Sequence, residues 1–264
     1  MQRARSLFLL ASLGLLSIRA GAETWKGSFA SENWVKDWQV RPTRYFGLKE
    51  SSLVMHSKSE PSFLRISFPK GSATRSLSRK YKLPEGGAQF LTTVPTFPKK
   101  GVEEASLTYS VRFAKGFDFV KGGKLPGLFG GKRISGKDYP TGDDGFSSRL
   151  HWRADGYGQI KAYLPVEGGS APEFGTQTFR FKPGKWHVIR QKVVLNDPKR
   201  PNGRLMMWFD GKLVINESQV LYRTGSRLRI EGLFFCTFFG GGTKEWASTR
   251  NTFADFRDFS ISTP

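Results

Sequence analysis

The chain has 264 residues and a formal net charge of +20, with 42 lysines and arginines against 22 aspartates and glutamates. A charge balance this basic indicates a polyanionic partner, namely a nucleic acid, an anionic membrane or an acidic polysaccharide. The single cysteine, Cys236, excludes an internal disulfide, so the fold must rely on its hydrophobic core.

The N-terminal segment has the pattern of a secretory signal peptide. Arg3 and Arg5 form a basic start, residues 7–16 are apolar, and Ala20-Gly21-Ala22 is a small-residue cleavage signal. We therefore expect cleavage after residue 22 and a single mature domain over residues 23–264. The signal peptide takes three arginines and no acidic residue, which leaves a net charge of +17.

Secretion narrows the choice of partner. A protein that is secreted or periplasmic does not normally meet nucleic acid. No later apolar run is long enough to span a bilayer, and no basic amphipathic helix is evident, so no membrane contact is expected after cleavage. An acidic polysaccharide is the remaining partner, and we expect the protein to be a monomer.

The first strand signals in chain order are the period-two segment 105–113 and the hairpin pattern of residues 146–163. Residues 185–196 follow as a Trp-led strand, and residues 205–215 form a hairpin around Asp210-Gly211. Residues 228–241 and 251–262 supply two more strands. Many short strands with little helical periodicity predict an all-β fold. The Trp-led strand before an Asp-Gly hairpin resembles a β-jelly roll, a concanavalin-like sandwich of two antiparallel sheets.

A glycine-rich stretch, "KGGKLPGLFGGKR", covers residues 121–133. Glycine permits close approach of the backbone to another group, and Lys124 precedes Leu125 and Pro126 in an otherwise apolar context. Taken alone, this composition favours a loop with solvated lysines.

The hairpin of residues 146–163 places polar side chains on one face, because alternate residues of a strand share a face. An exposed face normally mixes charges of both signs to limit repulsion, whereas this one has no carboxylate. The absence favours a binding face over a merely solvated one. Its members are Ser147, Arg149, His151, Arg153, Lys161 and Tyr163.

Residues 237–253 add Lys244 and Trp246 after a glycine-rich turn. An indole ring is a natural platform for a sugar ring, although a tryptophan packed against the rim of a loop fits equally well. Cys236 lies in "LFFCTFF" and is expected to be a buried, inert thiol. His187 is expected to be structural and His56 to lie at the surface.

The basic and phenolic side chains of this predicted face suit β-elimination of a uronate better than hydrolysis of a glycosidic bond. A glycosidase needs two carboxyl groups flanking the bond, and no close-set Glu/Asp pair lies on a predicted strand. β-Elimination of a 1,4-linked uronate needs a cation for the carboxylate, a base for the C5 proton and an acid for the leaving O4. Arg, Lys, His and Tyr meet those needs without a metal or cofactor, and metal-binding Cys or His spacings are absent.

Three stretches together, "KGGKLPGLFGG", "SSRLHWRADGYGQIKAY" and "TFFGGGTKEWAS", resemble polysaccharide lyase family 14, the alginate and glucuronan lyases. The resemblance extends from about Leu107 to Phe259. It implies a β-jelly roll with a cationic groove across one sheet. The functional lysine of the family falls on Lys124 and its Ser-x-Arg pair on Ser147 and Arg149. Of its Tyr-x-Tyr pair only Tyr163 matches.

The resemblance implies the following roles. Arg149 clamps the uronate carboxylate, and Tyr163 protonates the leaving oxygen or acts as a phenolate base. Lys124 is the competing base or a second partner of the carboxylate, and His151 is a third candidate base. Lys161 replaces a family tyrosine and leaves substrate preference open. The remaining substrate-binding candidates are Ser147, His151, Arg153, Lys161, Lys244 and Trp246.

The expected function is cleavage of a polyuronate, mannuronate-rich alginate in the first place, to products with 4,5-unsaturated ends. Three alternatives stay open. These alternatives are a lyase of glucuronan, a non-catalytic lectin-like module that binds acidic polysaccharide, and an endo-hydrolase of a neutral β-glucan.

Overall fold

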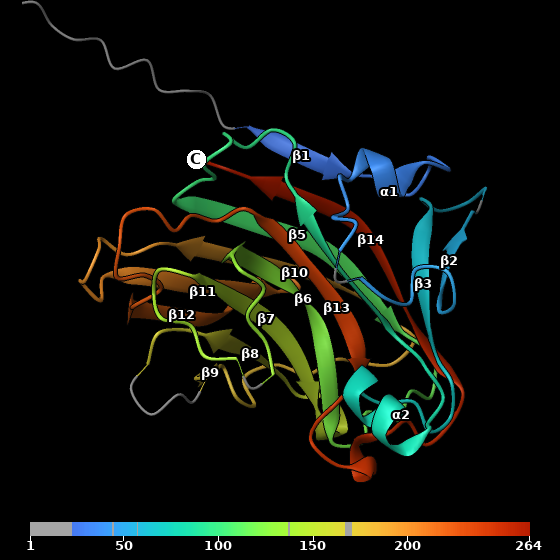
Figure 1. Cartoon of the computed structure of the whole chain (residues 1–264). Coiled ribbons are helices and arrows are strands. Elements are labelled where there is room, and N and C mark those ends of the chain that lie inside the picture. The colour runs from blue at the N-terminus through green and yellow to red at the C-terminus, as the bar shows by residue number, and fades with distance from the viewer. Residues whose placement is uncertain (1–22, 44, 57, 137, 167–170) are drawn as a thin grey trace, which may run out of the picture.

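The computed structural model describes residues 23–43, 45–56, 58–136, 138–166 and 171–264, so the predicted signal peptide lies outside the described residues. Two antiparallel sheets pack face to face, and the six-stranded sheet lies nearer the viewer in Figure 1. This arrangement confirms the predicted β-jelly roll. Within the described ranges, no helix is long and apolar enough to cross a membrane.

The eight-stranded sheet has the order β12-β11-β10-β5-β14-β3-β2, with β1 paired to β14. The predicted hairpin between β11 and β12 turns at Asp210 and Gly211, whose positive φ angles of 49° and 83° suit a type I′ turn. The strands are β1 (Thr24–Gly27), β2 (Ser52–Met55), β3 (Phe63–Phe68), β5 (Glu104–Phe113), β10 (Trp186–Val194), β11 (Gly203–Phe209), β12 (Lys212–Val220) and β14 (Thr252–Ser262).

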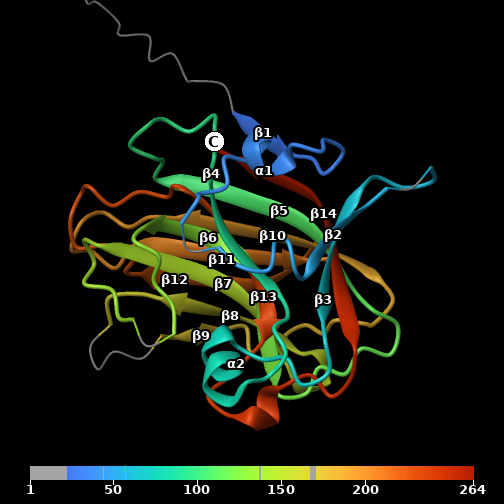
Figure 2. The ribbon, with the colours of Figure 1, turned by 45° about the vertical axis from the view of Figure 1, so that its right-hand side comes forward.

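The six-stranded sheet has the order β4-β13-β6-β7-β8-β9. Its strands are β4 (Ala88–Thr93), β6 (Gly122–Gly131), β7 (Gly145–Arg153), β8 (Gly158–Tyr163), β9 (Glu173–Phe174) and β13 (Gly232–Phe239). Helix α1 (Trp34–Asp37) lies beside β1, and α2 (Arg75–Tyr81) lies at the opposite end of the molecule (Figure 2). Short 3-10 turns cover Ala154–Gly156 and Lys244–Trp246.

The core fills the space between the two sheets. The predicted inward face of β5 is completely buried, and it consists of Ala105, Leu107, Tyr109, Val111 and Phe113. From the other sheet, Phe146, Leu150 and Trp152 of β7 join the same core. Because side chains alternate along β7, Ser147, Arg149 and His151 lie on the outer face of the six-stranded sheet.

The glycine-rich segment forms strand β6, so the prediction of a loop is wrong. The strand lies between β13 and β7. A Cβ atom on Gly123 would lie 2.0 Å from the Trp152 ring, and one on Gly127 would lie 1.9 Å from the Ser148 carbonyl oxygen. Glycine is therefore required by close packing against a neighbouring strand. The pairing is irregular between Lys124 and Gly127, which accommodates Pro126, a residue with no N–H to donate.

Candidate active site

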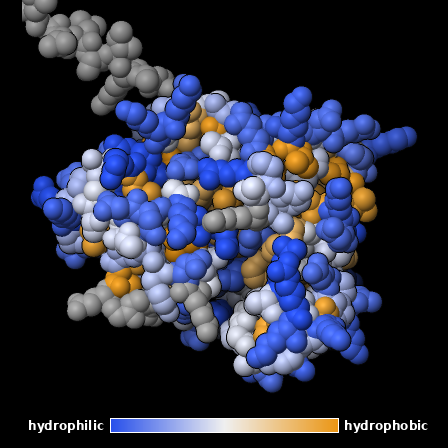
Figure 3. Space-filling model, viewed as in Figure 1, coloured by the Kyte–Doolittle hydropathy of each residue, from blue (hydrophilic) through white to orange (hydrophobic). Residues whose placement is uncertain are grey.

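Strand register brings the predicted polar residues together on the outer face of the six-stranded sheet. Across β7 and β8, Ser147 pairs with Tyr163 and Arg149 with Lys161. Across β6 and β7, Lys124 lies opposite His151. We call the four basic side chains on this surface, Lys124, Arg149, Arg153 and Lys161, the cationic face. The molecule is hollowed on this side, next to the α2 region (Figure 3).

Arg149 occupies the middle of the site and is completely buried. Its guanidinium carbon lies 4.5 Å from the ring centroid of Phe234 and 5.1 Å from that of Tyr163. Nη1 donates to the Cys236 sulfur at 3.3 Å. Nε and Nη2 have no hydrogen-bond partner within the described part of the chain. These two atoms share one edge of the guanidinium, which is the edge that binds a carboxylate through two parallel hydrogen bonds.

The segment between β6 and β7 folds back over Ser147 and Tyr163. The Ser147 hydroxyl donates to the Ile134 carbonyl at 2.7 Å, and the Gly136 N–H donates to the Tyr163 hydroxyl oxygen at 3.1 Å. Ser147 is completely buried and Tyr163 is 3% exposed. The cationic groove that the family resemblance implies would leave Arg149 and Tyr163 accessible, whereas both side chains are covered here. A carboxylate reaches Arg149 only after the covering groups move.

Lys124 and His151 carry the strongest electrostatic perturbations of the site. Burial, followed by repulsion from Arg149, lowers the pKa of Lys124 from 10.5 to about 7. Burial, followed by the charge of Lys124, holds the pKa of His151 well below its usual 6.5. His151 Nε2 is also buried and has no partner among the described residues. Near neutral pH, Lys124 therefore exchanges its proton readily, and His151 is neutral.

Arg153 and Lys161 form the more open part of the cationic face, and they share a carboxylate. Arg153 Nη2 lies 2.5 Å and Lys161 Nζ 3.3 Å from Glu173 Oε1. Partial burial of Glu173 opposes ionisation, but a hydrogen bond from Gln159, followed by the charges of Arg153 and Lys161, lowers the pKa of this carboxyl. Glu173 was missed by sequence analysis, which treats this surface as free of carboxylates. Its strand, β9, is only two residues long and shows no alternation.

Trp246 and Lys244 lie at the edge of the site. The Arg153 guanidinium carbon is 5.8 Å from the Trp246 ring centroid, which places this indole beside the cationic face. The Lys244 ammonium lies 4.3 Å from the ring centroid of Tyr81 on α2. Lys244 therefore reaches toward the helix, and Trp246 is the member of this pair that contacts the site.

The remaining histidine and cysteine predictions concern structural groups. His187 is 1% exposed, lies 2.8 Å from the Asp210 carboxylate through Nδ1, and accepts the Lys182 N–H through Nε2. This confirms a structural histidine. Cys236 is a buried free thiol, as predicted. Its contact with Arg149 could not be predicted from the apolar sequence around it.

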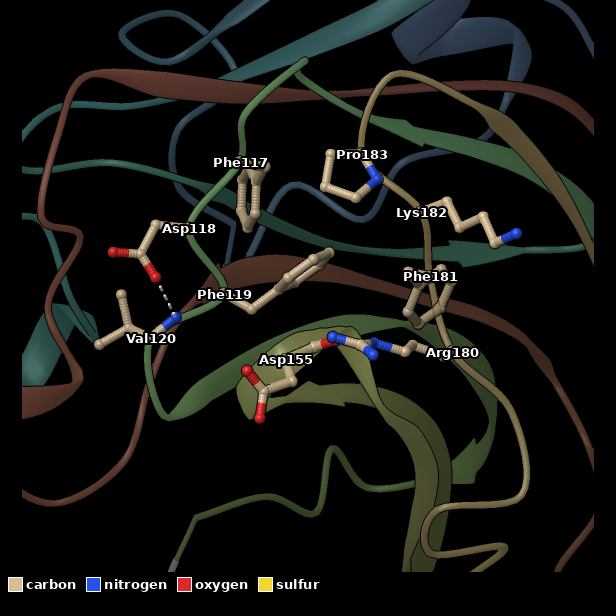
Figure 4. A pocket seen from close by; sticks show the side chains of 9 residues that line it. All are labelled: Phe117, Asp118, Phe119, Val120, Asp155, Arg180, Phe181, Lys182 and Pro183. Carbon is tan, nitrogen blue, oxygen red and sulfur yellow. Dashed lines mark hydrogen bonds between the residues drawn. The ribbon is translucent and has the colours of Figure 1, made fainter.

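A separate pocket of about 440 Å³ lies outside the cationic face, between the β5–β6 connection and residues 180–183 (Figure 4). Asp118 accepts hydrogen bonds from Thr249 and from the Val120 N–H, which lower the pKa of this carboxyl. Asp155 adds a second carboxylate to the lining, although Arg180 and Lys182 are also present. No residue predicted for the site lines this pocket, and its carboxylates disfavour an acidic sugar.

No group of three or more His, Cys, Asp or Glu side chains within the described ranges could hold a metal ion. The cationic face itself presents four cations, the Tyr163 phenol, the His151 imidazole and the Glu173 carboxylate.

A jelly roll with cations and aromatic rings across one sheet face is suited to binding an acidic polysaccharide. Residues 56–259 match the family model described as Polysaccharide lyase 14. The chain belongs to polysaccharide lyase family 14, and it is a polysaccharide lyase, a carbon–oxygen lyase of the alginate and glucuronan lyase type.

Solved structures agree with this assignment. The chain is similar to the family 14 alginate lyase from Aplysia kurodai, with 27% identity, a TM-score of 0.77, and coverage of 92% of this chain and 98% of that one. It shares its fold with an alginate lyase from a Chlorella virus (24% identity, TM-score 0.72, 89% and 98% coverage). An endo-β-1,4-glucuronan lyase from the fungus Trichoderma reesei also shares the fold (11% identity, TM-score 0.56, 92% and 95% coverage). No curated protein sequence matches the chain.

Proposed function

We propose that the protein cleaves a 1,4-linked polyuronate, mannuronate-rich alginate in the first place, by β-elimination. The observation that carries this proposal is the buried guanidinium of Arg149, whose Nε and Nη2 have no partner among the described residues. A buried cation without a counter-ion is costly. A uronate carboxylate supplies that counter-ion, and its binding there places the C5 proton within the site.

Arg149 acts on the charge that develops during the reaction. Removal of the C5 proton delocalises negative charge onto the carboxylate oxygens, and a fixed guanidinium on those oxygens stabilises the enolate-like transition state. The contacts with Phe234, Tyr163 and the Cys236 sulfur hold the guanidinium in place before substrate arrives. Preorganisation of this kind avoids reorganisation during the reaction.

Lys124 is the base that the electrostatics favour. A general base works best when its pKa lies near the working pH. The pKa of Lys124 is about 7, whereas that of His151 is held well below 6.5. A neutral Lys124 amine therefore accepts the C5 proton more readily than His151 does. His151 lies opposite Lys124 in the strand register and is available as a hydrogen-bonding neighbour.

Tyr163 is the acid in this scheme. Its hydroxyl oxygen accepts the Gly136 N–H, so its own proton remains available for the leaving O4. We expect Tyr163→Phe to lower kcat by about 10²- to 10⁴-fold, the range for loss of a general acid or base. Initial rates of unsaturated product formation measure this effect. A normal rate in the phenylalanine variant would show that the phenol transfers no proton.

The choice of polymer rests on the relatives and on Lys161. The Aplysia kurodai relative is named as an alginate lyase, which supports alginate. The Trichoderma reesei structure is named as a glucuronan lyase, and it shares only the fold. Lys161, beside Arg149 in the register, offers a further cation for a polymer that presents a carboxylate on every sugar.

The first experiment is incubation of the mature protein with mannuronate-rich alginate, guluronate-rich alginate and glucuronan. We expect near-ultraviolet absorbance from a new C4–C5 double bond, fastest with mannuronate-rich alginate. Binding to these polymers without new absorbance would identify a lectin-like module. New reducing ends without absorbance, obtained from a neutral β-glucan, would identify a hydrolase.

We also propose that residues 1–22 are a cleaved signal peptide and that residues 23–264 form a single secreted or periplasmic domain, active as a monomer. The basic start, apolar run and Ala-Gly-Ala signal support cleavage. Intact mass and sedimentation of the exported protein test both points. A mass that includes the first 22 residues would contradict the cleavage.

A further inference from the structure

The open part of the cationic face is occupied by a carboxylate of the protein itself. Glu173 Oε1 lies 2.5 Å from Arg153 Nη2 and 3.3 Å from Lys161 Nζ. The side chains of Arg153, Lys161 and Glu173 are 27%, 28% and 34% exposed. Unlike Arg149, these cations are therefore open to solvent, and Glu173 is the group that occupies them.

The positions of the two cations suit a second sugar of the same polymer. Lys161 pairs directly with Arg149 across β7 and β8. Arg153 lies four residues beyond Arg149 on β7, a separation of about 13 Å along the strand. A polyuronate presents one carboxylate per sugar. A chain whose first carboxylate binds Arg149 thus brings a neighbouring carboxylate to the two cations that now hold Glu173.

We propose that Arg153 and Lys161 form a second carboxylate subsite, which Glu173 fills in the free protein and leaves when polyuronate binds. The inference rests on the proposed function for its substrate class. Glu173 acts as an internal competitor of the substrate and lowers the affinity for the polymer. Its chemical group is the same as that of the incoming ligand, so the exchange leaves neither cation unpaired.

The structure makes this exchange inexpensive. Ion pairs that are partly open to solvent contribute little to stability. Strand β9 has two residues and pairs only with β8, at the edge of the sheet. Glu173 can therefore move away without disturbing the core or a central strand.

If Glu173 instead helps the site to bind substrate, the predicted change in affinity has the opposite sign. If Glu173 served to hold Arg153 and Lys161 in a productive position, its neutralisation would weaken binding. As a competitor, its neutralisation strengthens binding. The sign of the change in affinity therefore decides between the two.

The test measures the affinity of mannuronate oligosaccharides of defined length by titration calorimetry, in a Lys124→Met background, in which turnover is expected to be slow. We expect Glu173→Gln to tighten binding by about two- to fivefold at low salt, the range that a partly exposed ion pair allows. The gain should shrink as salt screens the cations. It should also become smaller when Lys161→Met is added, because Arg153 is then the one cation of the pair that Glu173→Gln sets free.

Glu104→Gln is the matched control. Glu104 makes an equally exposed ion pair, 2.5 Å from Lys192, but the pair joins β5 and β10 in the other sheet. We expect no change in affinity from this variant. Oligosaccharides of cellulose, which lack carboxylates, should show no gain with Glu173→Gln.

Unchanged or weaker binding in Glu173→Gln overturns the subsite proposal, as does an equal gain in Glu104→Gln. The same proteins with Lys124 intact test the proposed function independently. Tighter binding without any unsaturated product would uphold the subsite and reject the lyase mechanism. Product formation without a change in affinity would do the reverse.

Discussion

Replacing Arg149 by alanine is expected to lower kcat/KM on a polyuronate by about 10²- to 10³-fold, the cost of losing one preorganised group that stabilises developing charge. The loss should appear mainly in kcat, because the guanidinium acts most strongly on the charge that forms in the transition state. Continuous recording of unsaturated product under initial-rate conditions measures both constants.

The fold should survive this change. Arg149 makes no ion pair among the described residues, and one of its few contacts is a weak hydrogen bond to the Cys236 sulfur. Its removal therefore relieves an unpaired buried charge while leaving a cavity beside Phe234. Circular dichroism and thermal unfolding should resemble those of the wild type. Arg149→Lys is the matched control, because it keeps the charge but loses the two-pronged edge.

Retained turnover in a folded Arg149→Ala protein would remove the carboxylate clamp from the mechanism. Lost turnover together with lost secondary structure would instead mean that the side chain is needed for folding. Partial activity in Arg149→Lys, above that of the alanine variant, would support the role of the positive charge.

The hairpin β7–β8 could be predicted because its pattern is local. Alternation along each strand fixes which residues share a face, and the structure places Arg149 and Tyr163 on one surface as the pattern predicts. The inward face of β5 followed from the same rule. In these strands, apolar and polar residues alternate over the whole length, and the sequence alone was sufficient to assign each side chain to a face of the sheet.

Strand β6 was missed because its high glycine content is explained by close contacts with β7, a strand that lies later in the chain. Gly123 and Gly127 are small because Trp152 and the Ser148 carbonyl approach them. These neighbours are about 20 to 30 residues away in sequence, as the β6–β7 pairing shows. A run of glycines read without its neighbours resembles a loop.

The covering of the site and the place of Glu173 were also tertiary effects. The backbone groups of Ile134 and Gly136 bind Ser147 and Tyr163, and backbone groups carry no sequence signal. Glu173 reaches the cationic face from a two-residue edge strand. Motif spacing therefore predicted which cations form the site. It did not predict that Glu173 is a counter-ion of two of them, or that Arg149 is buried.

The second large effect concerns Lys124 and the pH dependence of the reaction. Lys124→Met should lower kcat by about 10²- to 10⁴-fold, as expected for loss of the base. In the wild type, the neutral amine is the active form, and the pKa of Lys124 is about 7. Activity should therefore rise with pH, reach half of its maximum near pH 7 and level off about one pH unit higher. A plot of kcat/KM against pH for the free enzyme measures this limb.

The causes of the lowered Lys124 pKa predict how this pKa changes when a neighbouring charge is removed. Burial is the largest cause, and repulsion from Arg149, Lys161 and Arg153 adds to it. Removing one of these charges favours the protonated amine, so Lys161→Met should raise the pKa of Lys124 and move the limb to higher pH. Lys192→Met, in the other sheet, removes the same charge far from Lys124 and should leave the limb in place.

The rising part of the pH profile could stay in place in Lys161→Met, or it could move equally in Lys192→Met. Either result would show that the pH dependence does not arise from the titration of Lys124. A limb well below pH 6.5 would instead point to His151, whose pKa is held below that value. Burial of Lys124 among like charges disfavours its charged form, and this depression is what makes an amine usable as a base near neutral pH. The cations that bind the polymer thus also prepare the group that deprotonates it.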